Sequence, residues 1–389
     1  MQNYSFDEII DRRKSNSYKW DTPTDEETLP MWVADMDFKT APCIIESLRR
    51  RVEHGVFGYT KVPADYYKAI VDWFMRRHDW VINPEHIIYT SGVVPALSAI
   101  IKGLTRPGDK VIVQTPAYNC FFSSIRNNGC LLAANELTYH SDGRYTIDFE
   151  NLEQLSHDAS LMILCNPHNP AGRVWKREEL ARIAEICRRN NVIVVADEIH
   201  CELTYPGHDY IPFAFVAEEV GVAYVVTNSP SKAFNTAGLQ IANIITPDAA
   251  MRSRIDRAIN DNEVCDVNPF GVVGLIAAYN EGEGWLDDLI AYLHTNYLYA
   301  RNFFKERLPH FTVSPLEGTY LLWVNCSPTG MDSDEICLRL EEDGKVMLSP
   351  GSIYGKGGEH FIRINLACPK KILKEGLSRI EKVLSQVVP

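Results

Sequence analysis

The chain has 389 residues, and at about 150 residues per domain this length predicts two or three domains. Hydrophobic residues make up 46% and charged residues 23% of the chain, which is the balance of a globular protein with a large core. The net charge is −12 and the lysines and arginines are scattered, so we do not expect nucleic acid, which needs concentrated positive charge, as the main partner.

The N-terminal 20 residues carry acidic and basic side chains between Asp7 and Lys14 and have no apolar stretch, which is unlike a signal peptide. Apolar stretches such as residues 272–279 are far shorter than the roughly 20 residues that cross a bilayer, so no membrane contact is expected. The ten cysteines include no C-x-x-C pair. They predict reduced thiols in a cytoplasmic protein, without a structural metal site.

A strand that runs into a helix is predicted at residues 87–104, with the helix over 96–104. The backbone N–H groups of Gly92, Val93 and Val94 lie where that helix begins. A helix dipole and free N–H groups suit an anion, so these residues are candidates to bind a phosphate. The alternative is that Ser91 simply caps the helix.

From about residue 87 to 245, short apolar runs alternate with amphipathic stretches, which is typical of a parallel sheet with crossover helices. The runs are apolar throughout, as strands buried on both faces should be. They lie at residues 111–113, 161–164, 192–195 and 224–226. The stretch 176–190 between two of them has helical spacing and ends in basic residues.

Each apolar run is followed by a polar segment. These segments are residues 115–118, 166–170, 197–200 and 229–232. Ligands of open parallel sheets bind beyond the carboxyl ends of the strands. Any one segment would be an ordinary loop, but their recurrence at the same position predicts one shared site.

Asp197 ends the most apolar run, where an unpaired carboxylate is unfavourable. It could cap a following helix, or it could pair with the protonated pyridine nitrogen of a cofactor. His200 lies three residues further on and could face the same ring, although alone it would be read as a core histidine.

Lys232 follows the fourth run and lies among small hydroxyl residues, Ser229 and Ser231. Hydroxyl groups can donate to a phosphate without adding bulk. An amine in this position can form a Schiff base with a carbonyl cofactor, although most loop lysines are simply solvated.

After about residue 285 the pattern changes to long helices and two strands. We predict helices over 285–308 and 370–388 and strands over 318–324 and 360–365. The predicted division is an N-terminal segment 1–47 belonging to a small α+β domain, a large domain over 48–287, and the rest of the small domain over 288–389.

Arg363 is a charged residue inside the apolar strand 360–365. Such an arginine needs a partner. A substrate α-carboxylate, held by both arms of the guanidinium, would provide one, and a buried structural ion pair is the alternative.

The motifs NPHNPAG at 166–172, DEIH at 197–200 and SPSK at 229–232, together with Arg363, resemble the fold type I pyridoxal-phosphate (PLP) enzymes of the aspartate aminotransferase superfamily. That resemblance implies an α/β fold whose large domain contains a mostly parallel seven-stranded sheet. It spans nearly the whole chain.

Within this superfamily the chain looks most like the PatB/MalY branch of cystathionine β-lyases, or C–S lyases. The similarity rests on LPMWVADMDF at 29–38, EHGVFGYT at 53–60 and EGTYL at 317–321. It implies elimination from L-cystathionine or L-cysteine, giving pyruvate, ammonia and homocysteine or hydrogen sulfide.

The resemblance also implies roles for individual residues. Lys232 would bind the cofactor covalently and move the Cα proton. Tyr118 would stack on the cofactor ring and Asn169 would bind its phenolic oxygen. Asp197 would hold the ring nitrogen. Tyr59 resembles a tyrosine that reaches the phosphate of the neighbouring subunit, which implies a homodimer with shared sites.

The position eight residues after the lysine is Gln240, where aminotransferases commonly have an arginine that neutralises the phosphate. Transamination of a neutral or aromatic amino acid remains an alternative function, as does a lyase with an added regulatory binding role. The segment 260–268, which by resemblance borders the partner's site, contains three acids and no base. This favours the lyase, because a dicarboxylic keto acid needs a cation.

Overall fold

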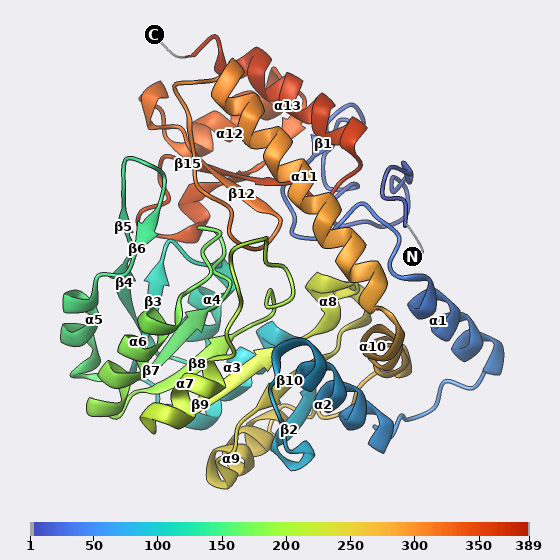
Figure 1. The fold of residues 1–389 in the computed structure, drawn as a ribbon, viewed down its shortest axis with the longest axis vertical. Helices are drawn as coiled ribbons and strands as arrows, with labels where there is room; N and C mark the ends of the chain where they lie inside the picture. The colour runs from blue at the N-terminus through green and yellow to red at the C-terminus, as the bar shows by residue number, and fades with distance from the viewer. Residues whose placement is uncertain (1–3, 388–389) are drawn as a thin grey trace.

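The computed structural model describes residues 4–387. Its largest feature is a seven-stranded sheet with the strand order β2-β10-β9-β8-β7-β3-β4 (Figure 1). These strands are β2 (Ile87–Thr90), β3 (Lys110–Thr115), β4 (Leu131–Glu136), β7 (Ala159–Cys165), β8 (Ile193–Asp197), β9 (Tyr224–Asn228) and β10 (Ala242–Ile245). All are parallel except β10, which is antiparallel to both of its neighbours. The predicted α/β fold with a mostly parallel seven-stranded sheet is confirmed.

Helices cover both faces of this sheet (Figure 1). One face packs against α3 (Val93–Leu104), α4 (Asn119–Asn127) and α9 (Ala249–Asn260). The other face packs against α5 (Phe149–Ser156), α6 (Arg177–Arg189) and α7 (Phe213–Val220). Val111 and Val113 point into the first layer while Ile112 points into the second. This alternation explains the continuous apolar runs, since every side chain of such a strand is buried.

A second, four-stranded antiparallel sheet has the order β11-β12-β15-β14. Its strands are β11 (Thr312–Val313), β12 (Leu321–Asn325), β14 (Ser349–Pro350) and β15 (Phe361–Asn365). The helices α11 (Glu283–Arg307), α12 (Ser333–Glu342) and α13 (Lys370–Leu384) lie around it (Figure 1). β1 (Leu29–Pro30) pairs in parallel with β13 (Val346–Met347), so the N-terminal chain lies with the C-terminal part. The last predicted helix, 370–388, is observed as α13 over Lys370–Leu384, and residue 388 lies outside the described residues.

Several further elements complete the described chain. They are the helices α1 (Pro42–His54), α2 (Ala64–His78), α8 (Pro230–Ala233) and α10 (Pro269–Glu281), the hairpin of β5 (Thr138–Tyr139) and β6 (Tyr145–Thr146), and the short 3-10 turns Pro84–His86, Ala237–Leu239, Ser327–Thr329 and Gly351–Tyr354. The predicted domain boundary at 287 falls within α11, and the domain limits stay a prediction.

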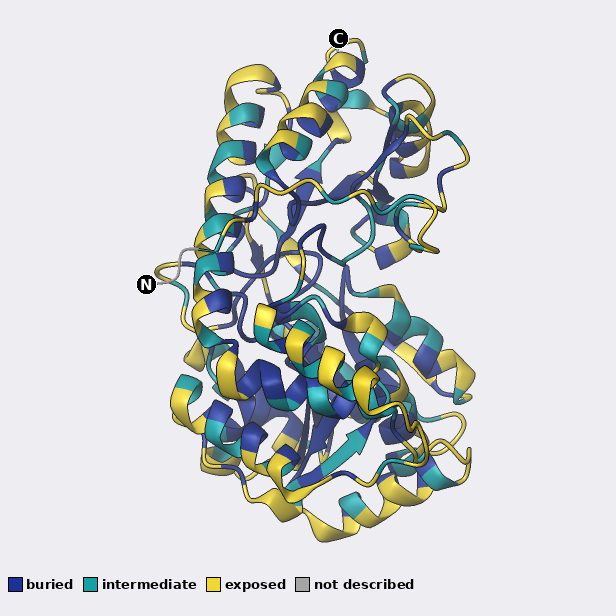
Figure 2. Ribbon diagram, turned by 90° about the vertical axis from the view of Figure 1, so that its right-hand side faces the viewer, coloured by how far each residue is buried: buried dark blue, intermediate teal, exposed yellow. Residues whose placement is uncertain are grey.

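Two predicted elements begin three residues away from the expected position. α3 starts at Val93, not Ala96, and the strand predicted from residue 318 begins at Leu321. Burial follows the layers, with exposed residues on the outer faces of the helices and a buried sheet (Figure 2). Among residues 4–387, no helix combines the length and the apolar character needed to cross a membrane.

The carboxyl ends of the parallel strands face the second sheet. Just beyond β3, Ala117 N donates to Tyr354 O (2.8 Å), and beyond β7, Asn169 Oδ1 accepts from Arg363 of β15 (3.1 Å). The polar segments predicted to share one site therefore meet between the two sheets.

Candidate active site

A cavity of about 200 Å³ lies at the carboxyl ends of the parallel strands. Every residue predicted to contribute to the site lines this cavity, apart from Tyr59 and Arg363. The predicted residues that line it are Gly92, Val93, Val94, Tyr118, Asn169, Asp197, His200, Ser229, Ser231 and Lys232. They come from the five segments that follow β2, β3, β7, β8 and β9, and the last four of these are the polar segments whose recurrence along the chain predicted a shared site.

Lys232 enters the cavity from α8. Its Nζ donates to the main-chain carbonyl of Ala34 (2.7 Å). Burial, together with the charge of Arg363, lowers the pKa of the Lys232 amine to about 8. An amine whose pKa lies near neutrality has a larger unprotonated fraction, as a nucleophile or a base requires.

Asp197 lies at the end of β8 and is buried. Its Oδ1 accepts from Ile199 N (3.2 Å), and the carboxylate makes no ion pair with any described residue. Burial raises the pKa of this carboxyl to about 7. No helix follows directly, because the next one, α7, begins at Phe213. The capping alternative is therefore not what the structure shows, and a buried carboxylate on a cavity wall suits a cationic ring nitrogen.

The N-terminus of α3 forms another wall of the cavity. Gly92 is the N-cap residue, and no side chain caps the helix, so Ser91 does not play the role that the alternative gave it. Pro95 has no N–H, which leaves the donors of the first turn at residues 93 and 94. This end of the cavity suits an anion such as a phosphate.

The hydroxyl of Ser229, beside Lys232, already has hydrogen-bond partners within the chain. Ser229 Oγ accepts from Ser231 N (3.1 Å) and donates to Ile241 O (2.6 Å), so its hydroxyl proton already has a partner. Gln240 also lines this end of the cavity and has a left-handed backbone (φ 52°). The exposed side chain of Gln240 provides no positive charge.

Arg363 is only 5% exposed, yet it makes no ion pair with any described residue. Its Nη1 donates to Asn169 Oδ1 (3.1 Å) and its Nη2 donates to Trp32 O (2.8 Å). The guanidinium lies over the ring of Tyr354 (5.0 Å), and Nε is buried without a hydrogen-bond partner. The alternative of a structural ion pair is therefore wrong for the described residues. A buried guanidinium without an anion is a candidate carboxylate site.

The two histidines of the motifs have different surroundings. His200 lines the cavity, and burial together with the charges of Lys232 and Arg363 holds its pKa well below the usual value, so the ring is neutral. Its Nδ1 has no hydrogen-bond partner. His168 Nε2 instead lies 2.9 Å from Pro116 O, and burial lowers its pKa to about 4. His168 therefore holds two loops together, whereas His200 faces the site.

Tyr59 lies in the connection between α1 and α2 and is 99% exposed. It does not line the cavity of its own chain. Neighbouring Val56 and Phe57 are also exposed, and Phe57 packs on Phe270 (5.7 Å between ring centroids).

Sequence reasoning missed the contribution of residues 32–34. Main-chain carbonyls of Trp32 and Ala34 contact Arg363 and Lys232. The motif at 29–38 indicated the family. Its contacts with Lys232 and Arg363 are made by main-chain carbonyls, which every residue type has, so the sequence could not predict them.

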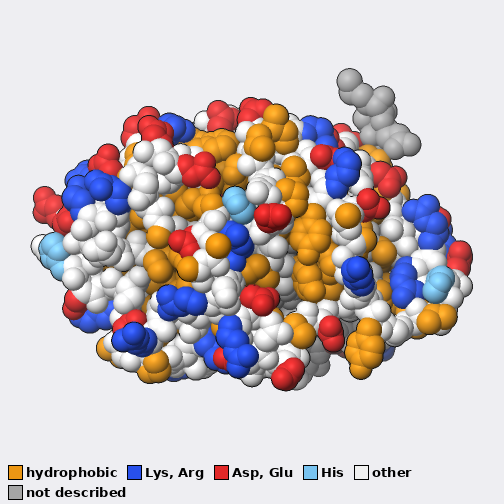
Figure 3. Space-filling view, turned by 90° about the horizontal axis from the view of Figure 1, so that it is seen from below, with side chains coloured by type: hydrophobic (Ala, Val, Ile, Leu, Met, Phe, Trp, Pro, Cys, Tyr) orange, Lys and Arg blue, Asp and Glu red, His pale blue; other side chains and the backbone are white. Residues whose placement is uncertain are grey.

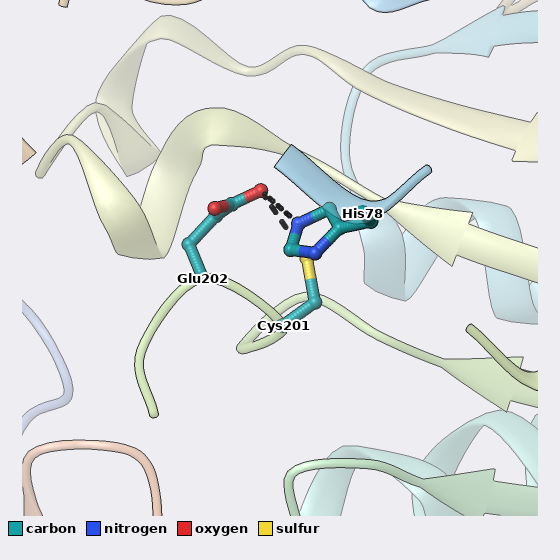
Figure 4. Close-up of side chains that lie close together, drawn as sticks. All are labelled: His78, Cys201 and Glu202. Carbon is teal, nitrogen blue, oxygen red and sulfur yellow. Dashed lines mark hydrogen bonds and ion pairs between the residues drawn. The ribbon is translucent and has the colours of Figure 1, made fainter. Parts of the chain in front are cut away.

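A buried group of possible metal ligands lies outside the cavity, formed by His78, Cys201 and Glu202 (Figure 4). Glu202 Oε1 accepts from Trp73 Nε1 (2.6 Å) and lies 2.8 Å from His78 Nε2, while Oε2 lies 3.4 Å from Arg77 Nε. Burial and the charge of Glu202 raise the pKa of the Cys201 thiol well above its usual value. The carboxylate is thus already paired and the thiol stays protonated, so this cluster joins the turn after β8 to α2 and does not suit a metal.

Lys and Arg are interspersed with Asp and Glu on the face of the molecule seen in Figure 3, with hydrophobic side chains between them. This face has no positive stripe of the kind that follows a nucleic-acid backbone.

Comparisons with known proteins identify the family of the chain. The family model for aminotransferase class I and II matches residues 28–380. The chain is 41% identical to cystathionine beta-lyase PatB of Bacillus subtilis over 98% of its own length and 100% of that protein. It is 32% identical to protein MalY of Escherichia coli over 99% and 100% of the two chains.

Among solved structures, cystalysin from Treponema denticola, which contains a pyridoxal 5'-phosphate cofactor, superimposes with a TM-score of 0.93 at 36% identity. The match covers 98% of this chain and 99% of cystalysin. The chain therefore belongs to the aminotransferase class I and II family of fold type I enzymes, in the branch that includes PatB and MalY.

Proposed function

We propose that this protein is a PLP-dependent C–S lyase that catalyses α,β-elimination from L-cystathionine or L-cysteine. The observation that carries the proposal is the full-length likeness to cystathionine beta-lyase PatB. L-Cystathionine and water would give homocysteine, pyruvate and ammonia, and L-cysteine and water would give hydrogen sulfide, pyruvate and ammonia.

The residues around the cavity fit PLP. Asp197 is a buried carboxylate without a cation, His200 is a neutral ring, and the start of α3 offers N–H groups to the phosphate. When bound, PLP withdraws electrons from the substrate Cα, which makes both the Cα proton and the β-sulfur easier to release.

In this proposal each residue has one task. Lys232 attaches the cofactor and moves the Cα proton, and Asp197 keeps the ring nitrogen protonated. Tyr118 stacks on the ring, and Asn169, which already accepts from Arg363, binds the phenolic oxygen. Residues 92–94, Ser231 and Ser229 hold the phosphate, Ser229 by turning its hydroxyl proton from Ile241 O to a phosphate oxygen. His200 lies against the ring.

Arg363 binds the substrate α-carboxylate in this proposal. Replacing it with lysine should raise KM for L-cystathionine by about tenfold or more, because an ammonium cannot form the bidentate contact. The kcat should change much less. Steady-state kinetics measures both constants, and an unchanged KM would return Arg363 to a structural role.

Transamination is the second candidate. A dicarboxylic keto acid would need a free cation near its distal carboxylate. Of the basic residues beside the segment 260–268, Arg257 pairs with Asp261 (2.8 Å), and Lys102 lies 3.8 Å from the same carboxylate. These pairs support the lyase over a dicarboxylate transaminase.

The preferred sulfur amino acid is tested by comparing kcat/KM for L-cystathionine and L-cysteine, with homocysteine and sulfide measured as the respective products. A thiol product from either substrate supports C–S cleavage. Consumption of substrate without any thiol product would contradict it.

We also propose a homodimer in which Tyr59 completes the cofactor site of the partner subunit. Its exposed side chain and the apolar residues beside it support this assembly.

The cytoplasm is the proposed location, because all ten cysteines are free thiols. A regulatory binding role would be additional to catalysis.

The shared site predicts complementation between two impaired variants. A Tyr59→Phe chain and a Lys232→Ala chain should each have low activity as homodimers. Mixed heterodimers contain one site with both residues intact and should regain up to about half of the wild-type activity per dimer. Activity that never rises on subunit exchange would contradict shared sites.

A further inference from the structure

Residues 32–37, here called the strap, lie beside the cavity and contact both Lys232, which lines it, and Arg363, which is bonded to the cavity residue Asn169. Trp32 O accepts from Arg363 Nη2 (2.8 Å), and Ala34 O accepts from Lys232 Nζ (2.7 Å). The strap belongs to no helix or strand, so its position depends on the side chains that hold it.

Two asparagines hold the strap from opposite sides. Asn365 of β15 donates to Val33 O (2.5 Å) and Asp35 O (2.6 Å). Asn235, just after α8, accepts from Met36 N (2.9 Å) and donates to Met36 O (2.9 Å). The strap is thus bonded both to the strand that carries Arg363 and to the segment that carries Lys232.

A buried charge cluster holds the far end of the strap. Lys19, only 1% exposed, places Nζ 2.8 Å from Asp37 Oδ2 and 3.7 Å from Asp35 Oδ1. Arg12 lies 2.7 Å from an oxygen of each of the same two carboxylates, and Trp20 Nε1 donates to Asp37 Oδ1 (2.7 Å). Two cations from the N-terminal chain therefore neutralise the two acids of the strap.

Burying a lysine requires a large desolvation free energy, which a well-packed apolar pair of the same volume would avoid. Such clusters can instead specify one arrangement of the chain. In this protein the cluster fixes the strap. The Trp32 carbonyl of the strap accepts from Arg363 Nη2 and so orients the guanidinium, while Arg363 Nε stays without a hydrogen-bond partner.

We propose that Lys19 and Arg12 are positioning residues for substrate binding, which act through Asp37, Asp35 and the Trp32 carbonyl on Arg363. This inference rests on the proposed function in one respect, namely that Arg363 binds the substrate carboxylate. Among the described residues, Lys19 and Arg12 neither line the cavity nor form a hydrogen bond to a residue that lines it. Arg363, by contrast, donates to the cavity residue Asn169, so we place only Arg363 in contact with the substrate.

The test is a double-mutant cycle on KM. Lys19→Met removes the buried charge and keeps much of the side-chain volume. It should raise KM for L-cystathionine about tenfold, change kcat no more than about twofold, and leave the bound cofactor in place. In an Arg363→Lys background the same change should have almost no further effect on KM, because the group that it positions is gone.

The matched control is Lys39→Met, at an exposed ion pair with Glu8 two residues beyond the strap. Its KM should equal that of the wild type. Arg12→Met, at a partly exposed position, is the second variant if Lys19→Met does not fold, and the same rise in KM is expected. Lys19→Arg, which restores a cation, should recover most of the affinity.

An unchanged KM in both Lys19→Met and Arg12→Met would overturn the inference. It would also be overturned if the rise in KM caused by Lys19→Met were as large in the Arg363→Lys background as in the wild type. If Arg363→Lys itself leaves KM unchanged, the proposed carboxylate site has failed instead. The two failures are therefore distinguishable within one set of measurements.

Discussion

Replacing Lys232 with alanine should abolish turnover and the covalent link to the cofactor. This lysine is the only one that lines the cavity among the described residues, and its amine has a pKa lowered to about 8 by burial. Losing a positioned proton-transfer group alone lowers a rate by roughly 10²–10⁴-fold, and losing the cofactor link adds to that. Steady-state turnover of L-cystathionine measures the loss.

The attachment point can be identified directly. Purified wild-type protein should be yellow, because a lysine-bound cofactor absorbs visible light. Borohydride reduction followed by peptide mapping should place the label on Lys232. A Lys68→Ala variant, at an exposed lysine of α2, provides the control and should behave as wild type. A label on any other lysine would contradict the assignment.

Asp197→Asn should retain the fold and much of the cofactor binding but lose most of the activity. The neutral amide cannot keep the ring nitrogen protonated, and a charge-assisted hydrogen bond of this kind contributes about 1.5–3 kcal/mol. That range corresponds to a rate loss of about 10- to 150-fold. The measurement compares kcat with the dissociation constant of PLP, and near-wild-type kcat would mean that the carboxylate serves only the structure.

The cofactor-free protein gives an independent readout of the same residue. Burial raises the pKa of Asp197 from its usual value to about 7, so the folded state binds the proton more tightly than the unfolded state. Proton binding by Asp197 therefore adds to the free energy of unfolding. This contribution is complete at pH values below the pKa that Asp197 has in the unfolded chain, and it is lost as the pH rises through about 7. Above that pH, cofactor-free Asp197→Asn should melt at a higher temperature than cofactor-free wild type. A lower melting temperature at pH 8 would indicate a structural carboxylate.

The sequence was most informative about the site where a charged residue stands in an apolar strand that is expected to be buried. Asp197 and Arg363 interrupt apolar strands, and both are buried without an ionic partner among the described residues. The parallel sheet was predictable because its strands are buried on both faces and so contain no polar alternation. Convergence of the polar segments followed from strand direction alone.

Other features depend on tertiary contacts that residue types do not reveal. The first turn of α3 extends back to Val93, before the apolar spacing from which the helix was predicted. Ser229 was predicted as a phosphate ligand, and its role stays a prediction, but its hydroxyl also bonds Ile241 O and Ser231 N. The contacts of the strap carbonyls with Lys232 and Arg363 span about 200 and 330 residues of sequence, and no local pattern encodes them.

The reaction type is the central claim, and pyruvate formation in the absence of any keto acid tests it most directly. A β-sulfur aligned with the π-system of the cofactor ring should leave before a proton reaches the cofactor carbon, the step that amino-group transfer requires. This preference is a positioning effect. L-Cystathionine alone should then yield pyruvate, ammonia and homocysteine in equal amounts, with little amino-group transfer when 2-oxoglutarate is added. Robust transfer to 2-oxoglutarate with no pyruvate from L-cystathionine or L-cysteine alone would contradict the lyase, while leaving the fold and the cofactor site unchanged.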